Sequence, residues 1–135
     1  MILATIKSIA SMINARFIMV AFMFILCDIG TGFVSAIATN SFKSKIMREG
    51  GKHKVLLLSV IAFGVVLDVA QHMVDMGFNI PATTAICGYI TLMEIMSCLE
   101  NINKGFPGAL PKILTKTLSN AANEAGVGNE DINEQ

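Results

Sequence analysis

Three acidic residues stand inside long apolar stretches of the chain, where a carboxylate is chemically costly. Each stretch is long enough to cross a membrane: Asp28 lies in residues 17–38, Asp68 in residues 55–76 and Glu94 in residues 82–99. An acidic side chain at membrane depth costs about 2.5–3.5 kcal/mol on insertion scales, so such residues are rare and usually face a partner helix or water. Three of them in a 135-residue chain indicate helices that associate around something polar, which points toward a pore or channel.

The other reactive side chains form no catalytic or metal-binding pattern. His53 and His72 have no spacing that suggests a metal pair. The three cysteines fall in apolar stretches without zinc-type spacing, at Cys27, Cys87 and Cys98. Asp68 and His72 are i, i+4 neighbours that could relay a proton, but polar lining or helix contact is the expected role. The sequence therefore predicts no enzyme, no cofactor and no metal site.

The composition is that of a membrane protein. Of the 135 residues, 53% are hydrophobic and only 15% are charged, whereas a soluble domain of this length has a more charged surface. We therefore expect an all-α membrane protein with three transmembrane helices. An N-terminal amphipathic helix should precede them, and a short basic C-terminal helix and a disordered acidic tail should follow. A signal peptide ending near Ala38 is the alternative for the first stretch, but Asp28 fits such a signal poorly.

The expected membrane domain covers residues 17–118. The segment before it, residues 1–16, places isoleucines on one helical face, at Ile2, Ile6, Ile9 and Ile13. This segment either lies in the membrane interface or extends the first span. The C-terminal helix has an apolar face made of Leu110, Ile113, Leu114 and Leu118. Lys112 and Lys116 lie off that face and suit an anionic inner leaflet. Residues 119–135 form a polar and acidic tail, of which residues 126–135 are predicted to be disordered.

Basic residues cluster between the first two stretches. We expect a loop at residues 40–54 whose charges set the topology: Lys43, Lys45, Arg48, Lys52 and Lys54. The connection at residues 77–81 has no Lys or Arg. Because positive residues in short loops mark the cytoplasmic side, the basic loop and the C-terminus are predicted inside the bacterial inner membrane, and the N-terminus outside. For this loop we expect contact with lipid headgroups and no nucleic acid.

Each stretch also carries one polar stripe at helical spacing. These residues are predicted to line a pore or to mediate oligomerisation: Asp28, Thr31, Gly32, Ser35, Asp68, Gln71, His72, Glu94, Ser97, Glu100 and Asn101. Gly32 and Ala36 form a small-xxx-small pair that lets two helix backbones approach closely. The simpler alternative is that the stripes only hold a static bundle together, although a pore could be assembled from the same stripes.

Two groups of residues carry a resemblance to a known family. The first is Asp28-Ile-Gly-Thr-Gly32, followed by Ala36, Ser44-Lys45 and Gly50-Gly51-Lys52 with Lys54. The second, which is more specific, is Glu94-Ile-Met-Ser97-Cys-Leu-Glu100-Asn101, followed by Gly105 and Pro111. Together they resemble the phage holin family, in the branch that includes the clostridial toxin-secretion holins. The similarity covers about residues 17–114, and Cys98 stands where an aliphatic residue is usual.

The resemblance implies a protein that oligomerises in the bacterial inner membrane and then opens lesions abruptly. These lesions would release or activate a cell-wall hydrolase (an endolysin), and relatives are associated with export of large toxins. The implied partners are the lipid bilayer, further copies of the chain, an endolysin and an antiholin. A non-lytic membrane partner (an antiholin, scaffold or accessory subunit) and a small ion channel are the alternatives. A second translation start at Met12, which would remove Lys7, is a further hypothesis by analogy with dual-start holins.

Overall fold

The computed structural model describes residues 15–41 and 44–126, with the backbone alone at residues 44–47, 118 and 122. Within these ranges the chain forms four helices and no strand: α2 (Ala15–Ala38), α3 (Ser44–Met73), α4 (Ala82–Gly105) and α5 (Lys112–Glu124). The first three are long and apolar enough to cross a membrane. The predictions of an all-α chain, three membrane-spanning helices and a short C-terminal helix are therefore confirmed. The proposed N-terminal amphipathic segment lies outside the described residues, apart from Ala15 and Arg16.

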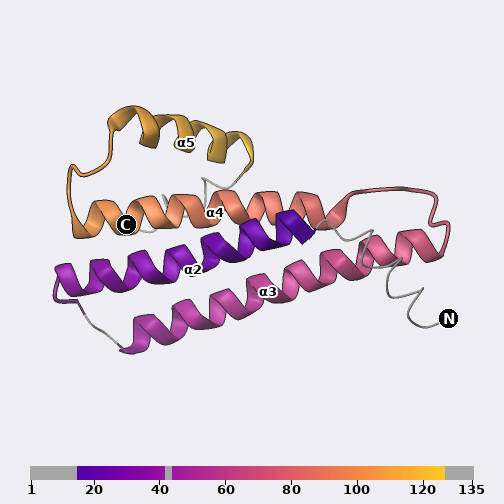
Figure 1. Cartoon of the computed structure of the whole chain (residues 1–135), viewed down its shortest axis with the longest axis horizontal. Coiled ribbons are helices and arrows are strands. Elements are labelled where there is room, and N and C mark those ends of the chain that lie inside the picture. The colour runs from indigo at the N-terminus through magenta and orange to yellow at the C-terminus, as the bar shows by residue number, and fades with distance from the viewer. Residues whose placement is uncertain (1–14, 42–43, 127–135) are drawn as a thin grey trace.

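Helix α4 is the centre of the bundle. Helices α2 and α3 both pack on it, and α5 folds back beside it (Figure 1). All three long helices contribute to one small apolar core, which consists of Ala21 and Ile25, Leu57 and Ile61, and Cys87 and Ile90. The core occupies the half of the bundle nearer the α3–α4 connection, because these residues fall early in α2 and α4 and in the middle of α3.

Two glycines let α4 approach its neighbours closely. A Cβ atom on Gly64 of α3 would lie 3.3 Å from the Cα atom of Thr83, at the start of α4. A Cβ atom on Gly105, at the other end of α4, would lie 3.1 Å from the Cα atom of Ser35 in α2. Small residues at helix crossings bring backbones together and so favour packing in membranes. The expected pair of Gly32 and Ala36 is thus supplemented by a Gly105–Ser35 contact on the same helix pair.

The turn between α2 and α3 is shorter than the sequence suggested. Helix α2 ends in a Schellman motif: Asn40 has a positive φ of 51°, and the Ser41 N–H donates to the Ala36 carbonyl at 3.0 Å. Helix α3 then begins at Ser44, so the expectation of a loop over residues 40–54 was wrong from that residue on. The reason is that the segment is rich in helix-forming Lys, Arg, Glu and Met, and neither Gly50 nor Gly51 is crowded.

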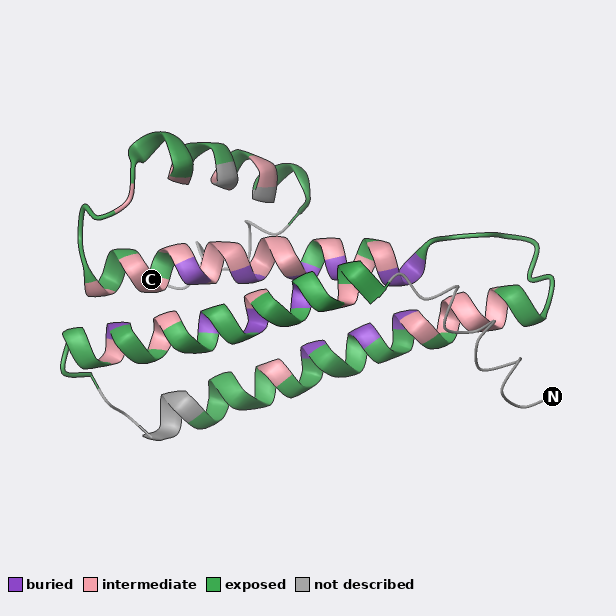
Figure 2. Cartoon of the chain, in the orientation of Figure 1, coloured by how far each residue is buried: buried purple, intermediate pink, exposed green. Residues whose placement is uncertain are grey.

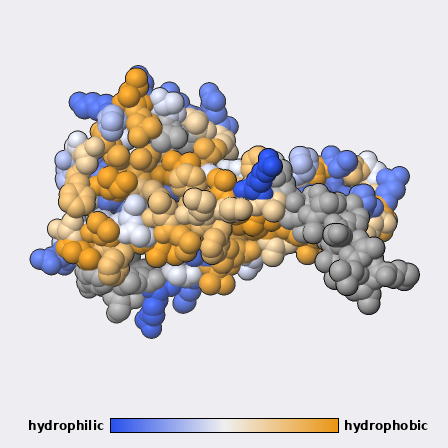
Figure 3. All heavy atoms as spheres, viewed as in Figure 1, coloured by the Kyte–Doolittle hydropathy of each residue, from blue (hydrophilic) through white to orange (hydrophobic). Residues whose placement is uncertain are grey.

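The outer surface of the three long helices is apolar. Burial is confined to the sides of the helices that face one another, and most of the rest is exposed (Figure 2). Large apolar side chains dominate the exposed positions of the spans, among them Phe22, Met23, Leu26, Phe63 and Val66. In the space-filling view apolar residues cover much of the visible face (Figure 3). Such a surface suits lipid hydrocarbon, whereas a soluble protein would bury these residues.

Helix α5 is longer than the sequence suggested. It continues past Leu118 to Glu124, so the polar tail expected from residue 119 is helical in its first part. No Gly or Pro stands between Pro111 and Gly126, and the φ of 77° at Gly126 marks the end of this segment. Ile113 is 77% exposed in spite of its place on the expected apolar face.

Candidate functional site

Four polar side chains from all three long helices meet in the middle of the bundle. The Lys54 ammonium of α3 forms an ion pair with the Asp28 carboxylate of α2, with 2.7 Å between Nζ and Oδ2. The same ammonium forms an ion pair and hydrogen bond with the Glu94 carboxylate of α4. The Asn101 amide of α4 donates to Asp28 Oδ1 at 2.9 Å. We call these four residues the central charge cluster.

The central charge cluster lies deep in the bundle and is almost closed to solvent. The side chains of Lys54, Asp28 and Glu94 are 12%, 11% and 2% exposed. Asp28 and Glu94 each stand roughly 15–20 Å from both ends of their helices, at 1.5 Å per residue. Buried charges are tolerated when they are paired and hydrogen-bonded, and both conditions hold here. The cluster contains two carboxylates for one ammonium, so its formal charges do not cancel.

Lys54 is the residue that sequence reasoning misplaced. We expected it to belong to a cytoplasmic loop and to set the topology, but it lies inside α3 and faces the two acids. A signal was present, because Lys54 shares one helical face with Leu57 and Ile61, which are buried in the core. Of the other expected loop charges, Arg48 and Lys52 are exposed on α3. Lys43 and the side chain of Lys45 lie outside the described residues.

The remaining stripe residues of α2 surround the cluster. The Thr31 hydroxyl donates to the Asp28 carbonyl at 3.1 Å, and its oxygen lies 3.5 Å from Asn101 Nδ2. A Cβ atom on Gly32 would lie 3.4 Å from that same amide nitrogen, so Asn101 fits over the space left by the glycine. Ser35 is buried against Gly105. On α4, Ser97 is half-buried and Glu100 is exposed, both outside the cluster.

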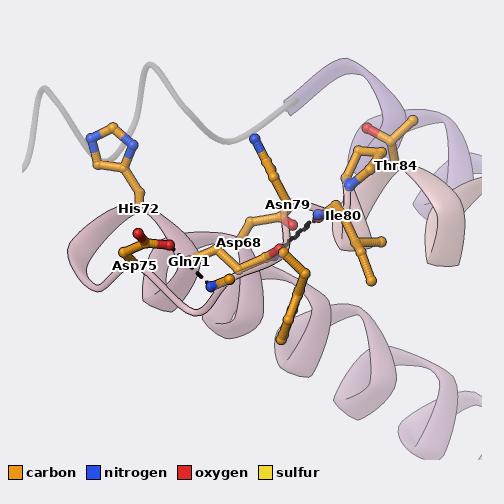
Figure 4. A pocket seen from close by; sticks show the side chains of 10 residues that line it. Asp68, Gln71, His72, Asp75, Asn79, Ile80 and Thr84 are labelled. Carbon is orange, nitrogen blue, oxygen red and sulfur yellow. Dashed lines mark hydrogen bonds between the residues drawn. The ribbon is translucent and has the colours of Figure 1, made fainter.

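A second polar group joins α3 to α4 at one end of the bundle (Figure 4). Asp68 accepts hydrogen bonds from the backbone N–H groups of Ala82 and Thr83, at 2.7 and 3.0 Å, and so caps the first turn of α4. The Gln71 side chain accepts from the Ile80 N–H at 2.7 Å and donates to the Ile80 carbonyl at 3.0 Å. Asp75 accepts from the Gly77 N–H at 3.0 Å. We call Asp68, Gln71 and Asp75 the loop cap.

The loop cap borders a surface hollow of about 820 Å³ that is also lined by His72, Asn79 and Thr84. His72 is exposed there, and the two Asp68 oxygens are engaged by backbone N–H groups of α4. Among the described residues no group of three or more His, Cys, Asp or Glu side chains could hold a metal ion. Of the residues expected to form one polar stripe along α3, Asp68 and Gln71 thus hold the connection to α4, whereas His72 only lines the hollow.

Comparison of the chain with known protein families gives one match. The sequence model of the bacteriophage holin family matches residues 8–123. The chain belongs to this family. The match covers all three membrane spans and nearly all of α5, and it confirms the resemblance seen in the sequence motifs. No curated protein and no solved structure matches the chain.

In this holin-family chain, the motif residues separate into two groups. Glu94 and Asn101 lie seven residues apart on one face of α4, and both contact α2 or α3 in the central charge cluster. Ser97 and Glu100 belong to the same motif but lie outside the cluster. Asp28, from the first motif, accepts from Asn101. The two motifs that carry the resemblance therefore meet at one place in the fold.

Proposed function

We propose that this chain is a holin: it oligomerises in the bacterial inner membrane and, at a timed trigger, opens lesions that release or activate an endolysin. The observation that carries the proposal is the family match across all three spans. The fold is consistent with it, because the unit presents an apolar exterior to lipid and keeps the charges of Asp28, Lys54 and Glu94 inside. Such a unit can accumulate in a membrane without opening it.

Opening then requires the helices to give up contacts within one copy and to pack against helices of other copies. The stripe residues named above line the lesion in this proposal, while the apolar faces of the helices stay against lipid. Hydration of carboxylates that were costly while buried supplies the driving force. Membrane voltage acts on charge with about 2.3 kcal/mol per elementary charge per 100 mV. Collapse of the potential can therefore shift a closely balanced equilibrium from the closed to the open arrangement.

We propose that the chain lies with its N-terminus outside and its C-terminus in the cytoplasm. Arg48 and Lys52, exposed at the start of α3, and Lys104, Lys112 and Lys116, at and after the end of α4, support this orientation. All five fall in the half of the bundle that lies away from the loop cap. The same proposal includes an antiholin as a regulatory partner and a large exported toxin as a cargo.

The decisive experiment is inducible expression in a bacterium that also makes a cytoplasmic endolysin without a signal peptide. Culture turbidity and the endolysin in the medium are followed, with and without a protonophore added early. The proposal predicts abrupt lysis that the protonophore advances.

A matched culture with a catalytically inactive endolysin serves as the control. There the protein should leave the cytoplasm at the same time while the wall, and hence the turbidity, stays intact. Slow growth arrest without release of either endolysin would overturn the proposal and favour a small ion channel or a non-lytic partner.

A further inference from the structure

Lys54 occupies the point where α3 leaves the bundle. Leu57 and Ile61, one and two turns further along the same face, are buried in the core. On the other side of Lys54, residues 48–53 are all exposed (Figure 2). Among the side chains of α3 that the structure describes, Lys54 is therefore the last one toward the start of the helix that reaches inward. Its ammonium joins all three spans, since it holds α2 through Asp28 and α4 through Glu94.

We propose that Lys54 is an electrostatic latch that holds the closed unit together and that must release Asp28 and Glu94 before a lesion opens. This inference rests on the proposed holin function and adds the residue that controls it. The cluster holds one ammonium against two carboxylates, and the Asn101 amide is the further donor to Asp28. The latch is thus short of positive charge, and this imbalance works against the closed state.

The charge imbalance makes the latch testable, because removing opposite charges should have opposite effects. Lys54→Met leaves two buried carboxylates without a cation, and leaving a buried charge unpaired shifts an equilibrium by about a hundredfold or more. Lysis should therefore begin earlier than in the wild type. Asp28→Asn leaves Lys54 paired with Glu94 alone, which balances the charges. Lysis in that variant should begin later.

Three controls separate a latch from general damage. His53→Met changes an exposed side chain next to Lys54 on the same helix and should keep wild-type timing. Lys54→Arg keeps the cation and should stay closer to wild type than Lys54→Met. The triple variant Asp28→Asn, Lys54→Met, Glu94→Gln has no charge in the cluster. If Lys54→Met lyses early because its Asp28 and Glu94 carboxylates are unpaired, the triple variant should restore late lysis.

Chemical labelling of Cys98 reports directly whether the latch is open. Cys98 is buried on the same face of α4 as Glu94, one turn further along, whereas Cys27 is exposed on α2. In a Cys27→Ser, Cys87→Ser background, a membrane-impermeant maleimide should label Cys98 only after opening. The Lys54→Met substitution in this background should raise the labelled fraction before any trigger, and Asp28→Asn should lower it after the trigger.

The outcomes distinguish the latch from the function on which it rests. If the wild type lyses on time but Lys54→Met and Asp28→Asn shift lysis in the same direction, or not at all, the latch is wrong and the holin function stands. Labelling of Cys98 that is equal before and after lysis would also overturn the latch. If the wild type never releases endolysin, the holin function itself fails, and Cys98 labelling still reports whether Lys54 keeps the unit closed.

Discussion

The central charge cluster and the loop cap use similar side chains for different tasks. In the cluster, Asp28 and Glu94 meet a lysine side chain from a third helix, in a place almost closed to solvent. In the loop cap, Asp68 and Asp75 accept from backbone N–H groups at the end of a helix and in a turn. The comparison teaches that the partner of a carboxylate, rather than its depth in an apolar stretch, indicates what it does.

The energetic consequences of the two arrangements also differ. A capped helix end satisfies donors that would otherwise be orphaned, and its loss is a local event. A buried ion pair contributes little net stability over an apolar replacement, but removing one partner alone is strongly destabilising. We therefore expect the cluster to respond far more sharply than the loop cap to single substitutions.

The largest effect is expected for Lys54→Met. The purified protein in detergent micelles should lose about 3–5 kcal/mol of its free energy of unfolding, because two carboxylates stay buried without their cation. Denaturant titration followed by helical circular dichroism measures this loss. Lys52→Met, at an exposed site on the same helix, should change the value by no more than about 0.5 kcal/mol. Equal stabilities of the two variants would remove the distinction between the cluster and the surface.

An intermediate effect is expected for Gly32→Leu. The Cβ position at Gly32 is 3.4 Å from Asn101 Nδ2, so a leucine there must push the Asn101 amide away from Asp28. The cost should be about 1–3 kcal/mol, as for other overpacked sites. Gly30→Leu is the matched control, since nothing lies within 4 Å of a Cβ atom at that exposed position of the same helix. The same titration checks both, and a larger loss for Gly30→Leu would contradict the close packing of Asn101 over Gly32.

The smallest effect is expected for Asp68→Ala. Loss of a helix cap costs about 0.5–2 kcal/mol, and here it should appear as faster amide hydrogen exchange at Ala82 and Thr83. Asp75→Ala, which removes a bond within the connection only, should leave those two amides unchanged. The shift in lysis timing should be much smaller than that of Lys54→Met. A shift as large as that of Lys54→Met would contradict the different tasks assigned to the loop cap and the central charge cluster.

The sequence by itself determined the membrane class, the three spans and the family. These follow from the length and apolarity of each stretch and from the spacing of residues such as Glu94 and Asn101, which are properties of single helices. The presence of costly acids at membrane depth was equally visible. Predictions that depend on one helix at a time therefore succeeded, and the pore-lining role of the polar stripes stays a prediction.

Only the tertiary structure decided what the acids contact. Lys54 and Glu94 are forty residues apart, and the basic character of the 40–54 segment favoured a loop. The local pattern placed Lys54 on one helical face with Leu57 and Ile61, but it could not indicate a pairing with acids on two other helices. Likewise, Asp68 caps a helix that begins fourteen residues later. The physical reason is that an ion pair or a cap depends on how helices are placed side by side. That placement arises from the close contacts at Gly64 and Gly105 and from the shared apolar core.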